Sequence, residues 1–408
     1  MRILVITHYF YPENFRINDV VGALVGRGHD VTVLTGIPNY PQGKLFGEYK
    51  LFRSEKIFGA RVIRVPLIPR GSGSAFRLLL NYFSFLFSAV FVGPMLLLGK
   101  NFDVVLSTAY SPPTGGLVGV IFAKIKSARS LLMVQDLWPA SLEFTGFVKN
   151  KLLLGMVGKV IAWMYNQTDY LLVQSQSFVS VINSQGIETE KMVYFPDWAE
   201  DIYKPAIDSS DCCLRHLFPR ANFTIVFAGN LGTAQSLETI IDAADLLRSS
   251  NIHWLILGDG SRKNWLESEV KSRKLESSIT LLGQVPMEHT PSYFYLGDVM
   301  LVTLSNDITL NTTLPGKVQS YMACGRPILS ALGGEGKKVI ESSGCGINVD
   351  PGNAKDLAMA ALKLSTLPRE ELEEMGDRSR EYCLDVFNKD ILLDKFEQLI
   401  NFENRRQR

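Results

Sequence analysis

Two hydrophobic periodicities alternate along the first half of the chain. Residues 2–10 form a largely apolar run, which predicts a buried strand, whereas residues 17–27 repeat apolar positions at helical spacing up to Gly28. Residues 29–35 form the next apolar run. This strand–helix–strand unit places the loop 8–18 at the carboxyl end of a parallel sheet, the edge where open sheets bind ligands. Further strands are predicted at residues 62–66, 104–107, 131–135 and 170–173.

The alternation is interrupted once and then starts again. Residues 195–205 lack apolar periodicity and predict a linker. Beyond it, strands are predicted at residues 224–229, 253–257, 279–282, 299–304 and 327–331, and helices at 236–248, 261–274 and 315–324. The repeated rhythm predicts an α/β protein with two doubly wound, Rossmann-like domains. We expect them to comprise residues 1–200 and 201–384, with a C-terminal helix within 385–408 packing back on the first.

Length and composition agree with two folded domains. A chain of 408 residues is too long for one ordinary core. The 42 Lys and Arg nearly balance the 41 Asp and Glu, so no overall charge favours a nucleic-acid partner. Five cysteines, including the adjacent Cys212 and Cys213, predict a reducing compartment rather than a disulfide framework. Because no basic region precedes the apolar run from Ile3, we expect a cytoplasmic protein without a signal peptide.

One segment is long and apolar enough to interact with a membrane. Residues Leu78 to Gly99 contain no charged residue, although Asn81, Gly93 and Pro94 interrupt the apolar pattern. Basic residues flank this and neighbouring apolar runs at Lys100, Lys124, Lys126 and Arg129. A core helix, an interfacial helix and a transmembrane span are all open. Since strands of one sheet lie on both sides of the segment, we expect peripheral attachment to the inner face of the cell membrane.

The loops after the strands exclude several nucleotide-binding classes. The first strand–helix turn, residues 7–14, lacks the Gly-x-Gly-x-x-Gly pattern of dinucleotide-binding folds, and no P-loop pattern occurs. No Asp-x-Asp is present to hold a divalent ion on a sugar nucleotide. In the second half, Gly229, Gly232 and Gly258 would let the backbone approach a ligand, although such glycines also occur for tight-turn reasons.

Residues 310–328 carry the most informative pattern. Thr312 or Thr313 would cap a helix that has Pro315 in its first turn, and the unpaired amides there would attract an anion. Lys317 lies in this first turn, where the helix dipole disfavours a cation. Its position therefore indicates a bound anion such as a diphosphate, or a solvated lysine.

Several motifs together resemble glycosyltransferase family 4. They lie at residues 2–7, 27–35, 36–43, 135–139, 258–260, 282–286 and 315–323. Residues 14–18 and 333–336 further resemble the WbuB-like branch of that family, proposed transferases of N-acetyl-L-fucosamine in O-antigen or capsule assembly. The resemblance implies a GT-B fold with two domains facing across a cleft. It also implies a UDP-sugar donor in the second domain, a lipid-linked saccharide acceptor at the first, and retention of anomeric configuration without a metal or organic cofactor.

The chain departs from the family pattern at charged positions. The family's glutamate pair falls on Thr312 and Ser320, and its Arg and Lys fall on Asn230 and Gln235. The His before the acidic residue of the first half is Gln135. Neutral side chains thus replace groups that hold the donor, and the diphosphate charge has to be neutralised from elsewhere.

We expect three cations to neutralise the diphosphate: Lys317, Arg262 and Arg16. The first two are the catalytic candidates, with helix-end amides, for stabilising the leaving group. Asp136 is the third catalytic candidate, because it follows a predicted strand and could stabilise a cationic sugar or orient the acceptor; it could also cap the next helix. Glu335 could bind sugar hydroxyls or serve a helix N-terminus.

The remaining predicted contacts follow from the same loops. Tyr11 and Trp138 are the acceptor-binding candidates, and Trp138 would otherwise be a core residue. The donor-binding candidates are Asn14, Arg16, Gly229, Asn230, Gly232, Gly258, Gly283, Gln284, Val285, Thr312, Thr313, Leu314, Lys317, Ser320 and Glu335. Two other functions share this architecture: a non-hydrolysing UDP-sugar epimerase and a non-catalytic sugar-nucleotide-binding partner.

Overall fold

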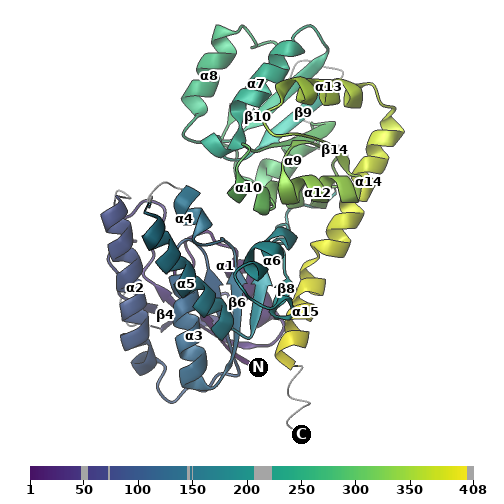
Figure 1. Ribbon diagram of the computed structural model, residues 1–408. Coiled ribbons are helices and arrows are strands. Elements are labelled where there is room, and N and C mark those ends of the chain that lie inside the picture. The colour runs from purple at the N-terminus through teal and green to yellow at the C-terminus, as the bar shows by residue number, and fades with distance from the viewer. Residues whose placement is uncertain (47–53, 72–73, 145–147, 149, 206–222, 402–408) are drawn as a thin grey trace. The chain divides into compact units, whose positions relative to one another are not determined.

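The computed structural model describes residues 1–46, 54–71, 74–144, 148, 150–205 and 223–401. The chain forms two compact units (Figure 1). Unit 1 comprises Met1–Phe195 and Leu392–Arg408, and unit 2 comprises Pro196–Ile391. The boundary lies within the segment 195–205 that lacks periodicity, and helix α15 (Lys389–Asn401) belongs to unit 1 from Leu392 onward.

Unit 1 contains an eight-stranded sheet of order β3-β4-β2-β1-β5-β6-β7-β8. Its strands are β1 (Arg2–Ile6), β2 (Asp30–Gly36), β3 (Ser54–Ile57), β4 (Ala60–Val65), β5 (Val104–Ala109), β6 (Arg129–Val134), β7 (Tyr170–Val173) and β8 (Met192–Tyr194). Strand β3 pairs antiparallel with β4, and the other registers are parallel. The predicted strand over residues 2–10 is too long, because the strand ends at Ile6; Tyr9 and Phe10 are buried in the loop that follows.

Helices cover both faces of this sheet. They are α1 (Ile17–Gly26), α2 (Ala75–Leu96), α3 (Thr114–Lys126), α4 (Ala140–Phe144), α5 (Lys151–Gln167), α6 (Gln176–Asn183), the 3₁₀ turn η1 (Thr189–Lys191) and α15. Right-handed crossovers from β1 to β2 and from β4 to β5 run in opposite directions, so α1 and α2 lie on opposite faces. Leu4 and Ile6 of β1 pack with Phe85 and Ala89 of α2 and Phe122 of α3 in one core cluster.

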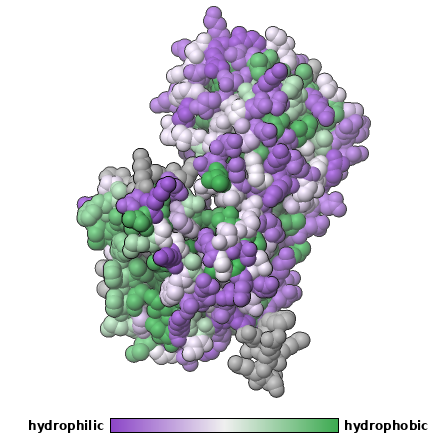
Figure 2. Space-filling model, viewed as in Figure 1, coloured by the Kyte–Doolittle hydropathy of each residue, from purple (hydrophilic) through white to green (hydrophobic). Residues whose placement is uncertain are grey.

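Helix α2 is apolar on both of its sides. Its inner stripe is buried and consists of Leu78, Asn81, Phe85, Ala89 and Gly93. Its outer stripe is exposed and consists of Phe76, Leu79, Phe83, Phe87, Phe91 and Met95. Figure 2 shows apolar side chains gathered over this helix. Among the described residues α2 is the helix long and apolar enough to cross a membrane, yet its inner stripe packs on the sheet as a crossover helix.

Unit 2 contains a six-stranded parallel sheet of order β11-β10-β9-β12-β13-β14. Its strands are β9 (Phe223–Ala228), β10 (Ile252–Leu257), β11 (Ile279–Gly283), β12 (Val299–Thr303), β13 (Ile328–Ala331) and β14 (Gly346–Val349). Along β9, Ile225 and Phe227 pack in one core cluster, and Val226 and Ala228 pack in another. This alternation shows that both faces of the sheet are covered.

The helices of unit 2 lie between these strands in the chain, except α13 and α14, which follow the last strand. They are η3 (Thr233–Gln235), α7 (Leu237–Leu246), α8 (Lys263–Ser272), η4 (Met287–His289), α9 (Thr290–Phe294), α10 (Ile308–Thr312), α11 (Gly316–Ala323), α12 (Gly334–Ser343), α13 (Ala354–Ser365) and α14 (Arg369–Val386). Cys324, Cys345 and Cys383 are free and buried, whereas Cys212 and Cys213 lie outside the described residues.

The contact between α3 and β5 depends on the absence of a side chain at Gly119. A Cβ atom there would lie 2.4 Å from the Cβ and Oγ atoms of Ser107. Gly119→Ala should therefore lower the free energy of unfolding by about 1–3 kcal/mol through overpacking. Gly155 in α5 has open space at its Cβ position, so Gly155→Ala should raise it by up to about 1 kcal/mol. Urea unfolding measures both changes, and equal shifts for the two variants would contradict this packing.

Candidate active site

Three glycine turns lie side by side at the carboxyl edge of the unit 2 sheet. Gly229, Gly258 and Gly283 end or follow the adjacent strands β9, β10 and β11. The Gly229 amide donates to the Leu257 carbonyl at 3.0 Å, and the Gly258 amide donates to the Gly283 carbonyl at 2.8 Å. Gly258 has a φ of 141°, and a Cβ there would lie 1.8 Å from the Gly229 oxygen. Only glycine allows the backbones to meet this closely at the ligand-binding edge.

The amine of Lys317 lies beside these turns. Lys317 is the second residue of α11, and its Nζ atom donates to Gln235 Oε1 at 2.5 Å. The same atom lies 4.1 Å from the centre of the Phe227 ring, and a Cβ on Gly229 would lie 3.0 Å from it. Burial lowers the pKa of Lys317 to about 7. Within the described residues no carboxylate pairs with this amine, so an anionic ligand would offset the cost of burying its charge.

The start of α11 differs from the sequence prediction. Thr312 and Thr313 do not cap α11; their hydroxyls donate to the Thr309 and Leu310 carbonyls of the short helix α10. The prediction was wrong because Asp307 starts a separate helix there, with its carboxylate accepting from the Thr309 amide at 2.8 Å. The N-cap of α11 is Pro315, without a side-chain cap hydrogen bond. The first turn of α11, which contains Lys317, is therefore not capped by the side chain of its N-cap residue.

Arg262 lies near the same edge, but its charge already has a partner. Its Nη2 atom donates to Glu238 at 2.6 Å, and its guanidinium lies 4.0 Å from the centre of the Trp265 ring. Its backbone amide donates to the Leu231 carbonyl at 2.9 Å. The Glu238 contact reduces the charge that Arg262 offers a diphosphate, and Lys317 is the stronger candidate. Nearby, Asn230 is exposed.

The other donor-binding candidates differ in whether their side chains are exposed or buried. Leu314 packs in the core, which leaves only its backbone for a ligand. Ser320 is buried and donates to a carbonyl one turn earlier in α11. Glu335 is buried in the first turn of α12. Gln284 is exposed after β11, and Val285 packs partly against the core. Their donor contacts stay predictions.

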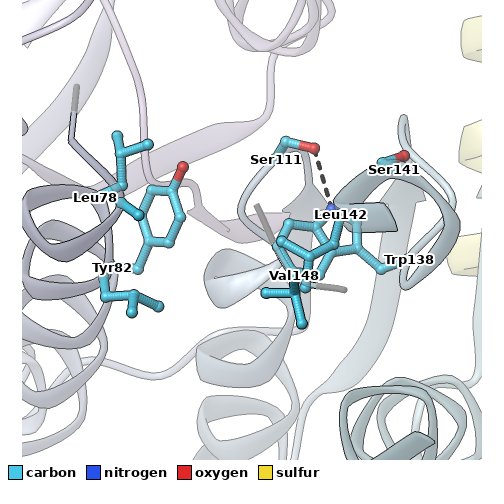
Figure 3. A pocket seen from close by; sticks show the side chains of 9 residues that line it. Leu78, Tyr82, Ser111, Trp138, Ser141, Leu142 and Val148 are labelled. Carbon is cyan, nitrogen blue, oxygen red and sulfur yellow. Dashed lines mark hydrogen bonds between the residues drawn. The ribbon is translucent and has the colours of Figure 1, made fainter. Parts of the chain in front are cut away.

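In unit 1, a serine joins two of the predicted residues. The Asp136 carboxylate accepts hydrogen bonds from Ser111; burial raises the pKa of Asp136, and these hydrogen bonds lower it. Trp138 Nε1 donates to Ser111 Oγ at 3.0 Å (Figure 3). Ser111 follows β5, the strand next to β6, so the two loops meet at the carboxyl edge of the sheet. No local sequence signal singled out Ser111.

The first loop exposes two of its three predicted residues, Tyr11 and Asn14, whereas Arg16 is half-buried. Tyr11 is exposed, and its carbonyl accepts from Arg64 Nη2 at 2.6 Å. Asn14 is also exposed. Arg16 forms an ion pair with Asp19 on its own helix at 2.9 Å. The donor role of Arg16 and Asn14 and the acceptor role of Tyr11 stay predictions.

Sequence reasoning missed Glu13, which holds the first loop in place. Its carboxylate accepts from the backbone amides of Phe10 at 3.1 Å and of Asn39 and Tyr40 at 2.8 Å each. Burial raises the pKa of Glu13 to about 7, against these hydrogen bonds. Glu13 thereby ties the first loop to the glycine- and proline-rich segment 36–43. Its one sequence signal is an acid in the loop that follows the first buried strand.

His8 was also missed and connects the same edge to α2. Its Nδ1 atom lies 3.0 Å from Thr114 Oγ1 at the start of α3, and its Nε2 atom lies 3.0 Å from Asn81 Oδ1 in α2. Burial lowers the pKa of His8 to about 3, so the ring is neutral. Asn81 also donates to the Ile68 carbonyl at 2.7 Å. Asn81, the polar residue that interrupts the apolar pattern of α2, is therefore hydrogen-bonded inside the fold.

The fold and the two sheet edges define a two-domain glycosyltransferase, and sequence comparison agrees. The family profile described as "Glycosyl transferase 4-like domain" matches residues 14–198. The profile described as "Glycosyl transferases group 1" matches residues 222–366. The chain is a glycosyltransferase built from these two domains, which confirms the predicted class of enzyme.

Two relatives illustrate the similarity. The chain is 26% identical over 418 residues to WcaI of Escherichia coli strain K12, whose name assigns it to colanic acid biosynthesis; the match covers 97% of this chain and 98% of WcaI. It is 24% identical over 273 residues to WbjE of Pseudomonas aeruginosa, named as a glycosyltransferase, covering 65% of this chain and 66% of WbjE. Both relatives are named as glycosyltransferases, in agreement with the family profiles.

Solved structures confirm the predicted GT-B fold. Anabaena HepE in complex with UDP has a TM-score of 0.72 and 14% identity, covering 98% of this chain and 100% of HepE. Sucrose-phosphate synthase from Thermosynechococcus elongatus has a TM-score of 0.69 and 16% identity, covering 99% of both chains. These identities are low, so the likeness concerns the fold.

Replacing Lys317 by methionine should separate stability from ligand binding. Lys317→Met removes a buried cation and should raise the free energy of unfolding by about 1–3 kcal/mol at pH 6. The same variant should bind UDP about ten- to a hundredfold more weakly. Adding Gln235→Lys should restore part of the affinity, because it returns an ammonium group to the same place. Calorimetric UDP titration and urea unfolding measure both effects; unchanged UDP affinity would exclude the role of Lys317.

The stability effect should depend on pH. Lys317 has a pKa of about 7 in the folded protein and an ordinary value of 10.5 when unfolded. Below pH 7 Lys317 is protonated in both the folded and the unfolded state, so the full cost of burying its charge lowers the stability of the wild type. Between pH 7 and 10.5 only the unfolded state holds the proton, and the free energy of unfolding of the wild type therefore rises with pH. The stability gap between Lys317→Met and wild type should therefore narrow over that range. A gap that stays constant would contradict the lowered pKa.

Proposed function

We propose that this glycosyltransferase moves a sugar from a UDP donor to a lipid-linked saccharide in surface polysaccharide biosynthesis, with retention of anomeric configuration. The donor sugar proposed is N-acetyl-L-fucosamine or a related amino sugar, as the resemblance to the WbuB-like branch implies. The observation that carries the proposal is the buried Lys317 amine, which lies beside Gly229 without a carboxylate partner in the described residues. A diphosphate would supply the missing negative charge.

The location of Lys317 supports a nucleotide diphosphate. It lies at the carboxyl edge of a parallel sheet, in the first turn of a helix whose N-terminus has no side-chain cap bond. HepE, which shares the fold, has been solved in complex with UDP and with UDP-glucose. The family's lysine position is occupied here by Gln235, and Lys317 brings its amine to that side chain from a different helix.

The proposed chemistry breaks the bond between the anomeric carbon and the UDP oxygen and forms one to the acceptor oxygen on the same face. Negative charge develops on the leaving diphosphate, where Lys317 and the amides of α11 stabilise it. The departing phosphate oxygen takes the acceptor proton, so no protein base is needed. Asp136, held by Ser111, stabilises the cationic sugar or orients the acceptor. No metal ion is needed, because the fixed cation neutralises the leaving group.

The outer surface of unit 1 supports attachment to a membrane. Exposed apolar residues continue from α2 to α5, where Leu152, Met156 and Trp163 are exposed. Helices α2, α3 and α5 carry basic residues and no acidic ones; the basic residues are Arg77, Lys124, Lys126, Lys151 and Lys159. Apolar burial combined with attraction to anionic headgroups is the usual mode of peripheral attachment. We place the enzyme at the inner face of the cell membrane, where its acceptor would be anchored. The name of WcaI, which refers to colanic acid, supports a surface polysaccharide as the product.

Sugar transfer should not need a divalent metal ion and should retain the anomeric configuration of the donor. Wild-type enzyme incubated with UDP-N-acetyl-L-fucosamine and a polyprenyl-diphosphate saccharide in excess EDTA should yield a product larger by one sugar, with the donor's anomeric configuration by NMR. Asp136→Asn should lower kcat by about 10²–10³-fold. Loss of activity in EDTA and recovery with Mn²⁺ or Mg²⁺ would overturn the metal-independent mechanism, and an inverted product would overturn retention.

Membrane binding should depend on the outer stripe of α2. Phe83→Asp with Phe87→Asp should reduce sedimentation with anionic liposomes by about tenfold, because two large apolar contacts are lost and like charge is added. Leu246→Asp changes an exposed leucine of unit 2 and serves as the matched control. High salt should partly release the wild type. Binding that is equal for all three proteins, or that only detergent reverses, would contradict peripheral attachment through α2.

A further inference from the structure

An apolar pocket lies beside the Asp136 loop in unit 1 (Figure 3). Its volume is about 110 Å³. Helix α2 contributes one wall, and the loop after β6 with α4 contributes the other; the main lining residues are Leu78, Leu79, Tyr82, Ser111, Trp138 and Leu142. The pocket is too small for a whole drug-sized ligand but has room for a short apolar segment of a longer one.

One end of the pocket reaches the catalytic edge. Ser111 lines the pocket and also donates to the Asp136 carboxylate. The Arg70 guanidinium lies close to Tyr82, where it opposes the rise in pKa that burial causes. Arg70 is placed 4.8 Å above the Tyr40 ring, and among the described residues no carboxylate forms an ion pair with it. The charge of Arg70 thus acts on Tyr82, one of the residues that line the pocket.

The other end continues into the apolar outer surface of α2. Leu79 lines the pocket and is also 51% exposed. Its neighbours on the outer stripe, Phe76 and Phe83, are 70% and 52% exposed. An apolar chain leaving the pocket past Leu79 would therefore meet apolar surface on that side.

On the basis of the lipid-linked acceptor proposed above, we propose that this pocket binds the first carbons of the acceptor's hydrocarbon chain. The chain would enter past Leu79, and its diphosphate would lie at the Ser111 end, with the saccharide and its reacting hydroxyl beyond it toward Asp136. A sugar is a poor occupant, because the mostly apolar walls would leave its hydroxyl groups without hydrogen-bond partners. The pocket would thus set the distance between the membrane surface and the reacting hydroxyl.

Filling the pocket tests this directly. Ala75 lines the pocket at the exposed first turn of α2, so Ala75→Phe should block it without disturbing the core. Met95→Phe adds a ring to the same outer stripe about 30 Å along the helix and is the matched control. Acceptors with a long prenyl chain and with a methyl group in place of that chain, carrying the same saccharide diphosphate, are compared in detergent, which removes any effect of membrane binding.

Wild type and Met95→Phe should show a KM about tenfold lower for the prenyl acceptor than for the methyl acceptor, the effect of burying about two methylene groups. Ala75→Phe should abolish that difference and leave the donor KM unchanged. If the wild type uses both acceptors equally, or if Ala75→Phe raises both KM values alike, the pocket assignment is overturned while the transferase function stands.

A second measurement does not depend on transfer. Trp138 lines the pocket, so a dibrominated decyl diphosphate should quench its fluorescence saturably, and Trp138→Phe should remove this quenching. The other four of the five tryptophans lie outside the lining and report non-specific quenching. Saturable quenching without transfer to either acceptor would overturn the proposed function and retain the pocket. Quenching that is unchanged in Trp138→Phe would overturn the pocket.

Discussion

A lysine amine buried in unit 2 without a carboxylate partner in the described residues imposes the strongest constraint on the site. Burial lowers the pKa of Lys317 to about 7, and within the part of the chain that the structure describes its amine contacts a neutral amide and an aromatic ring. A buried amine of this kind does not stabilise the fold, because a methionine side chain of similar shape would avoid the cost of desolvating a charge. Its neighbours keep the space around it open: Gly229 has no side chain there, and α11 begins without a side-chain cap bond. These features become consistent when the missing negative charge comes from a ligand.

In unit 1, buried polar groups connect an apolar helix to the loops that carry the candidate acceptor site. Asn81 of α2 contacts His8, and His8 contacts Thr114. Glu13 accepts three backbone hydrogen bonds and joins the first loop to residues 36–43. Because these groups are buried and hydrogen-bonded, a shift of α2 would leave several of them unsatisfied. The helix proposed to contact the membrane is therefore held in register with the edge that carries Asp136.

Departures from a family pattern can be compensated from elsewhere in the fold. Gln235 stands where the family has a lysine, and the Lys317 amine reaches it across 82 residues of sequence. Ser111 similarly joins Asp136 and Trp138 from the neighbouring strand. A comparison of motifs alone would register glutamine at position 235 as the loss of a positive charge. The structure shows a charge beside that position, supplied by another helix.

The local sequence pattern by itself determined the two α/β halves, most of their strands and the position of Lys317 in a helix first turn, because those features depend on apolar spacing and helix-start signals. It extended the first strand past Ile6, since Tyr9 and Phe10 are buried for tertiary reasons. It also assigned Thr312 and Thr313 to the wrong helix, because it did not detect that Asp307 starts a short one. Glu13, His8, Ser111 and Gln235 gained their roles only from tertiary structure. Each acts through partners that come from other loops or strands, and sheet order, which the sequence pattern does not specify, brings those partners together.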